Sequence, residues 1–214
     1  MLIQKQFKFE GAHIVHDAYS RRCSYSVHGH SYRADIGLYA PANALGPGQM
    51  VMDFGLMKST VPMGLFWDML DHTMLISDWA PQEYQDDMKK YSERWVIMPA
   101  NASAEMIALW GYVWMRAMLE NVRDANPDQG WLDDVSLSYV RVHETRTGFA
   151  EADEMDALEY GEEYGDDRSL ITDTYISNEL AAENPWFDSV KGIEEGSSRK
   201  VFAEDAWLLP TGNI

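Results

Sequence analysis

Three histidines in the first 30 residues have the type and spacing of a metal site. His28 and His30 are separated by one glycine, and alternate residues of an extended strand point to the same side, so both imidazoles would face one ligand. His13 would supply a third imidazole. Three histidines with one coordination position left for water or substrate are a common ligand set of catalytic zinc. The sequence therefore predicts a zinc site here.

The His-x-His pair has an alternative interpretation as the ordinary polar alternation of a surface strand. Five of the six histidines, together with the single cysteine, Cys23, lie before residue 73. This clustering favours a metal site over packing, with His16 and His143 interpreted as structural. A lone cysteine excludes an intramolecular disulfide framework, so Cys23 is either a small buried apolar residue or a reactive thiol.

The length and the charge limit what the chain could do. A chain of 214 residues is long enough for one domain with a substantial core. Its net charge of −18 argues against a broad phosphate-binding surface, so no direct nucleic-acid binding is expected. From Glu151 onward there are 17 acidic and 4 basic residues, a net −13 that leaves −5 for the first 150. No apolar run approaches the ~18 residues of a membrane span and no signal peptide is evident, so a cytoplasmic protein is expected.

The periodicity of apolar residues predicts four strands and two helices. Alternation indicates strands over 2–12, 28–40, 135–144 and 149–152, and helical spacing indicates helices over 54–70 and 103–122. Pro62 and Gly64 should bend or break the first helix, and Asn101 is suited to cap the second. Residues 76–100 show no clear pattern beyond a short charged helix near 86–90. This order predicts an α+β fold with an antiparallel sheet covered on one face by two helices.

Three features outside the histidine cluster remain open to more than one interpretation. Asp71 and His72 follow the first helix, either as a helix end with its histidine near the negative pole of the dipole or as a proton-transfer pair. Glu144 ends an apolar strand row, so it is either exposed at the strand tip or placed to bind a ligand. After residue 155 the apolar residues are confined to islands at 170–171, 186–187 and 207–209, which are predicted to pack on the body or on a neighbour.

Six segments together resemble the family of 6-pyruvoyl tetrahydropterin synthases and 6-carboxytetrahydropterin synthases. They are Phe9–His13, Cys23 with His28–His30, Val51–Phe54, Leu70–His72, Asn101–Glu105 and His143–Thr145. The resemblance covers residues 1–152 and implies a catalytic domain there, followed by an acidic C-terminal extension over 153–214. One departure is Asn101-Ala102-Ser103, where the family often has Asn-Pro-Thr.

The resemblance implies a tunnelling fold, in which three four-stranded sheets join into a barrel and two trimers stack into a homohexamer. It also implies roles for single residues. His13, His28 and His30 would be the zinc ligands, Cys23 the catalytic base, and Asp71 with His72 a second proton-transfer pair. Glu144 would accept hydrogen bonds from the pterin, and Ser103 would contact the pterin through its hydroxyl.

The implied activity is a zinc-dependent lyase that converts 7,8-dihydroneopterin triphosphate to 6-carboxy-5,6,7,8-tetrahydropterin, a precursor of queuosine and related 7-deazapurines. Elimination of triphosphate to 6-pyruvoyl tetrahydropterin is an alternative that uses the same metal, base and anchor. A non-catalytic pterin- or purine-binding subunit is another, and it would need only Glu144 and the pocket. A zinc-stabilised scaffold is a third. It would need a fourth protein ligand, for which Cys23 is the only thiol, and that role would remove the base. None of these requires a membrane.

Overall fold

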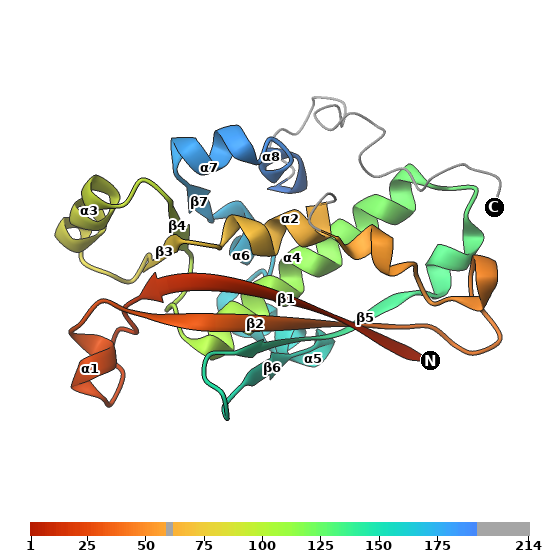
Figure 1. Cartoon of the computed structure of the whole chain (residues 1–214), viewed down its shortest axis with the longest axis horizontal. Coiled ribbons are helices and arrows are strands. Elements are labelled where there is room, and N and C mark those ends of the chain that lie inside the picture. The colour runs from red at the N-terminus through yellow and green to blue at the C-terminus, as the bar shows by residue number, and fades with distance from the viewer. Residues whose placement is uncertain (59–61, 192–214) are drawn as a thin grey trace.

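Seven strands form one mixed sheet in the computed structural model, which describes residues 1–58 and 62–191. The strands lie in the order β6-β5-β2-β1-β3-β4-β7. Their bounds are β1 (Leu2–His13), β2 (His28–Tyr39), β3 (Thr73–Ser77), β4 (Trp95–Met98), β5 (Ser136–His143), β6 (Ala150–Ala152) and β7 (Tyr175–Ile176). The two long strands β1 and β2 run side by side across the molecule (Figure 1) and carry the histidines.

The four predicted strands are β1, β2, β5 and β6, and they pair antiparallel with one another. The prediction that they form the whole sheet is wrong. β3 pairs parallel with β1, β4 parallel with β3, and β7 antiparallel with β4. All five residues of β3 are buried, so this strand lacks the alternation by which half-buried strands are found in a sequence. Residues 76–100, which showed no clear pattern, contain the last two residues of β3, all of β4 and the helix between them.

The helices begin and end close to the predicted positions where apolar periodicity is strong. Their bounds are α1 (Arg21–Ser24), α2 (Pro62–Met69), α3 (Gln82–Tyr91), α4 (Ala104–Ala125), α5 (Glu154–Tyr164), α6 (Ser169–Thr172), α7 (Asn178–Glu183) and α8 (Phe187–Lys191), with 3-10 turns at Pro47–Gln49, Phe54–Met57 and Gly130–Asp134. The predicted helix over 54–70 is divided into a 3-10 turn and α2, and Pro62 is the first residue of α2, where a missing N–H is tolerated. Figure 1 shows α4 crossing behind β1 and β2.

Asn101 is not the cap of α4, contrary to prediction. Ser103 occupies the capping position, and its hydroxyl accepts a hydrogen bond from the N–H of Met106. The Asn101 side chain instead bonds the main chain of His16, accepting from its N–H at 3.0 Å and donating to its carbonyl at 2.7 Å. Both residue types cap helices well, so the path of the chain decided which one does so here.

An aromatic cluster fills the space between the sheet and the helices. Trp67, Trp110 and Trp114 are fully buried, and Phe66 packs between them with ring centroids 4.8–5.5 Å away. Gly111 lets the Trp67 ring approach α4, because a Cβ at that position would lie 2.6 Å from the ring. This packing holds α2 and α4 against the same face of the sheet that carries the histidines, since Phe7, Phe9 and His13 of β1 are buried while Lys8 and Glu10 are exposed.

The described part of the C-terminal region shares this core. Leu170, Ile171, Trp186 and Phe187 are buried in the same apolar cluster, which confirms that the first two islands pack on the body. The third island, 207–209, lies outside the described residues. No helix in the described part of the chain is both long and apolar enough to cross a membrane.

Candidate metal centre

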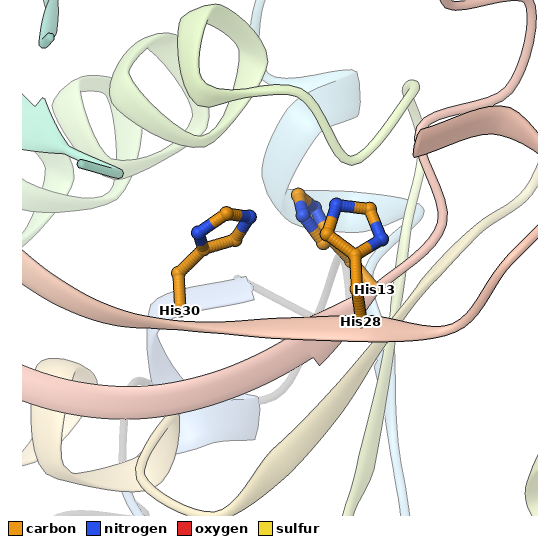
Figure 2. Close-up of side chains that lie close together, drawn as sticks. All are labelled: His13, His28 and His30. Carbon is orange, nitrogen blue, oxygen red and sulfur yellow. The ribbon is translucent and has the colours of Figure 1, made fainter. Parts of the chain in front are cut away.

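The structure brings His13, His28 and His30 together on one side of the sheet. His28 and His30 lie on β2, and His13, the last residue of β1, pairs directly with His28. One ring nitrogen from each lies within 4.8 Å of the others, and Figure 2 shows the three imidazoles grouped on the same side of β2. Pairing of two adjacent strands therefore assembles three potential metal ligands.

Main-chain carbonyls orient two of these rings. The Nδ1 atom of His13 lies 2.6 Å from the Ala102 carbonyl oxygen, and Nδ1 of His28 lies 2.9 Å from that of Ser26. A carbonyl only accepts hydrogen bonds, so each Nδ1 carries the proton and each Nε2 keeps its lone pair. Hydrogen bonds of this kind commonly orient metal-binding histidines.

The donor set fits a divalent metal such as zinc. The Nε2 atom of His30 is buried and has no hydrogen-bond partner among residues 1–58 and 62–191. A buried polar atom without a partner is costly, and a metal ion shared with His13 and His28 would satisfy it.

Burial keeps two of these imidazoles, those of His13 and His30, neutral. It lowers the pKa of His13 to about 4, partly opposed by the hydrogen bond to Ala102 and reinforced by His28 and His30. Burial also lowers the pKa of His30, with Glu144 opposing and His28 reinforcing the change. A neutral imidazole is the form that binds a metal, so His13 and His30 are ready to do so at neutral pH.

Glu144, the residue after β5, brings a carboxylate to the histidines. Its Oε1 atom lies 3.7 Å from Nε2 of His13 and 3.8 Å from Nε2 of His30, and its side chain is 27% exposed. The carboxylate is therefore not a solvated strand tip: it faces the centre while remaining accessible to a ligand.

Tyr32 belongs to this site and was not recognised from the sequence. Its hydroxyl lies 3.3 Å from both ring nitrogens of His13, and its ring is buried. Burial, reinforced by Glu144, raises the pKa of Tyr32, so the hydroxyl stays protonated. Its position two residues after His30 on the same strand face was the signal that could have identified it.

Cys23 lies in α1 with a half-buried side chain. The main chain of α1 is tied to the site. Val15, two residues after His13, donates its N–H to the Cys23 carbonyl at 3.0 Å. Among the described residues, no hydrogen bond joins the Cys23 thiol to the histidines. Its role as a base stays a prediction, as does that of Ser103, whose capping hydroxyl can still donate its own proton.

Asp71 and His72 form a pair in the turn between α2 and β3. Asp71 Oδ2 lies 2.9 Å from Nδ1 of His72, while Asp71 Oδ1 accepts from the Glu10 N–H at 2.8 Å. Within the described ranges, no hydrogen bond or ion pair connects this pair to the three histidines. His72 instead lines an open cavity of about 770 Å³ whose wall also includes Glu10, His30, Ser31, Arg94 and Glu179.

Comparison with known proteins identifies the family of the chain. Residues 2–155 match the family model described as 6-pyruvoyl tetrahydropterin synthase. The chain belongs to this family. Two proteins from two strains of Helicobacter pylori, each named 6-carboxy-5,6,7,8-tetrahydropterin synthase, are 30% identical over 188 residues, which is 88% of this chain and 88% of theirs.

A solved structure shows the same fold. An uncharacterized protein from Wolinella succinogenes superposes with a TM-score of 0.52 at 21% identity, over 72% of this chain and 98% of the other. The Helicobacter alignments span 188 residues and therefore extend beyond the residues that match the 6-pyruvoyl tetrahydropterin synthase family model. Part of the acidic C-terminal region is thus included in the similarity to these relatives.

Proposed function

We propose that this member of the family is a zinc-dependent lyase that converts 7,8-dihydroneopterin triphosphate and one water molecule to 6-carboxy-5,6,7,8-tetrahydropterin, acetaldehyde and triphosphate. The observation that carries the proposal is the cluster of three imidazoles with the Glu144 carboxylate beside it. The names of the Helicobacter relatives support the choice of product. The pterin would serve synthesis of queuosine or related 7-deazapurines in the cytoplasm.

His13, His28 and His30 would hold the zinc ion. When bound, zinc acts as a Lewis acid on the hydroxyl groups of the substrate side chain and eases removal of a neighbouring proton. Three protein ligands leave a coordination position for substrate, as in other catalytic zinc sites.

The protein groups would bind the pterin and move protons. Glu144 would accept hydrogen bonds from the N–H groups of the pterin ring, and Ser103 would donate its hydroxyl to the ring. Cys23 would remove a proton from the substrate side chain as thiolate. His72, with Nδ1 held by Asp71, keeps Nε2 free to take up or return a second proton.

We propose that the active sites are completed in a homo-oligomer, a trimer or a hexamer of two stacked trimers. This accounts for the absence of contact, within the described part of one chain, between the Asp71–His72 pair and the histidines. A neighbouring subunit would bring its own pair to the metal centre.

Three alternatives use these residues differently. Elimination of triphosphate to 6-pyruvoyl tetrahydropterin needs the same base, metal and anchor. A zinc-stabilised scaffold would need a fourth protein ligand, for which Glu144 is the nearest carboxylate. A pterin-binding subunit without activity would have no use for Cys23 or for the Asp71–His72 pair.

The test is to incubate the metal-analysed protein with 7,8-dihydroneopterin triphosphate and identify products by mass spectrometry. The proposal expects the 6-carboxy pterin with acetaldehyde, whereas a 6-pyruvoyl product would support the alternative reaction. Zinc without turnover would overturn both enzymatic functions.

A variant separates the role of Glu144 in pterin binding from a role in metal binding. Glu144→Gln should retain zinc and weaken pterin binding by at least ~10-fold, because hydrogen bonds to a charged group contribute ~1.5–3 kcal/mol each. Glu151→Gln, which removes a carboxylate paired with Arg141, is the matched control and should bind pterin normally. Loss of zinc in Glu144→Gln would identify this residue as a metal ligand instead.

A further inference from the structure

Arg94, just before β4, connects the Asp71–His72 turn to α7. On one side its Nε donates to the Asp71 carbonyl at 3.3 Å and its terminal nitrogen to the Met69 carbonyl at 3.5 Å. On the other side its second terminal nitrogen bonds Glu183 at 2.5 Å and Glu179 at 3.4 Å. One guanidinium therefore joins the turn to the C-terminal region.

The two carboxylates are held by a helix that is anchored in the core. Ser177 caps α7 through its hydroxyl, which accepts from the Leu180 N–H, and Leu180 is fully buried. Glu179 and Glu183 lie one turn apart on this helix, so both reach the same guanidinium. Residues 2–155 match the family model, and α7 lies after them. The two carboxylates that bind Arg94 therefore come from outside the part of the chain that matches the model.

The turn itself needs external support. His72 has a φ of +55°, a backbone conformation that non-glycine residues seldom adopt and that the surrounding structure must stabilise. Its N–H donates to the Glu10 carbonyl at 2.7 Å, which anchors one side of the turn to β1. The carbonyls of Met69 and Asp71 accept hydrogen bonds from the Thr73 hydroxyl, which belongs to the adjoining strand, and from Arg94, which ties them to α7.

We infer that Arg94 is a positioning residue for the Asp71–His72 pair, and that Glu179 and Glu183 hold Arg94 in place for this purpose. The inference rests on the proposed function, in which His72 exchanges a proton with the substrate. It gives the C-terminal region a part in catalysis, because α7 fixes the turn that would carry His72 to the metal centre of a neighbouring subunit.

The charge of Arg94 also supports the pair, because it favours the ionised form of Asp71. Burial raises the pKa of Asp71, but hydrogen bonds from Glu10 and His72, together with the charges of His72 and Arg94, bring the pKa below its ordinary value. An ionised Asp71 accepts the His72 Nδ1–H and so selects one tautomer.

The test uses the full-length double variant Glu179→Gln/Glu183→Gln, which keeps the shape of both side chains. The control is Glu159→Gln/Glu163→Gln, which removes two exposed carboxylates with the same spacing on α5. With 7,8-dihydroneopterin triphosphate, the first variant should lose ~10-fold in kcat with KM within ~2-fold, since a displaced group slows chemistry more than binding. The control should match the wild type.

A second measurement is independent of turnover. Protein labelled with ¹⁵N-histidine, assigned with His72→Gln, should show His72 protonated at Nδ1 in the wild type and the control, and a mixture of tautomers in the double variant. Arg94→Gln should reproduce the double variant. Arg94→Lys should recover only part of the effect, because an ammonium group does not span the turn carbonyls and both carboxylates.

Unchanged kcat and an unchanged His72 tautomer in the double variant would overturn the inference, as would equal losses in the control. If the wild type has no turnover, the proposed function fails while the tautomer comparison still decides whether α7 positions His72. A salt bridge that contributes only to stability would change the unfolding midpoint and neither of the other two readouts.

Discussion

The imidazole Nδ1 of His13 lies 2.6 Å from the carbonyl oxygen of Ala102, a hydrogen bond between residues 89 positions apart. It joins the end of β1 to the segment before α4 and orients the ring, whose Nε2 lies 3.7 Å from Oε1 of Glu144. Both His13 and Ala102 are fully buried. The metal centre is therefore tied to the packing of α4 on the sheet, and its ligands should respond to changes in either.

Removal of one ligand should abolish stable metal binding. His28→Ala should weaken zinc binding by more than ~100-fold, beyond what is typical for loss of a residue that only supports a ligand. Competition with a chromogenic chelator measures the affinity. His143→Gln is the control, because His143 bonds Asp35 at 3.0 Å and is not part of the cluster. Equal zinc affinity in His28→Ala and the wild type would exclude the three-histidine site.

The metal-free protein should become less stable as the pH falls from 6.5 to 4. The pKa of His13 is about 4 in the folded protein, and 6.5 is the ordinary value that applies to the unfolded chain. Between these two values the unfolded chain binds a proton that the folded chain does not. This difference removes ~3 kcal/mol from the free energy of unfolding by pH 4 and none above pH 7. Urea unfolding in the presence of chelator measures it. The His13→Gln variant should lack this component, so parallel pH curves for the two proteins would contradict the prediction.

Substitution of Gly111 should show how closely α4 packs. The Cβ of Gly111→Ala would lie 2.6 Å from the buried Trp67 ring. Overpacking of this kind costs ~1–3 kcal/mol, and the added helix propensity returns at most ~1 kcal/mol. Gly111→Ala should therefore lower the unfolding midpoint in urea. Gly130→Ala is the matched control, because a Cβ there has no neighbour within 4 Å. This control should leave the unfolding midpoint in urea unchanged or slightly raised. If Gly130→Ala lowers the midpoint and Gly111→Ala does not, the packing argument is refuted.

The C-terminal region should be required for stability. Trp186 is 1% exposed, and its Nε1 donates to Asn184 at 2.9 Å. Trp186→Ala should lower the free energy of unfolding by ~3–5 kcal/mol, as measured by urea unfolding, because it leaves a large cavity in the shared core. Leu158→Ala, at a position 50% exposed on α5, should change it by less than ~0.5 kcal/mol. Similar small effects of both substitutions would mean that the region packs only loosely.

Prediction from sequence succeeded where one periodicity dominated. The four antiparallel strands and α4 are half-buried elements, so the alternating or helical pattern of their apolar residues is visible in the chain. It did not find β3 and β4, because short strands buried on both faces carry no alternation. It chose the wrong cap for α4, since Asn101 and Ser103 suit that position equally well.

The residue types and spacing of His13, His28 and His30 by themselves determined a potential metal site, since strand geometry places alternate side chains on one face. Only the tertiary structure decided what surrounds it. The addition of Glu144 and Tyr32, the Ala102 carbonyl that selects the His13 tautomer, and the link from Arg94 to α7 all join residues distant in the chain. Local pattern does not contain such contacts, because they depend on how whole elements pack together.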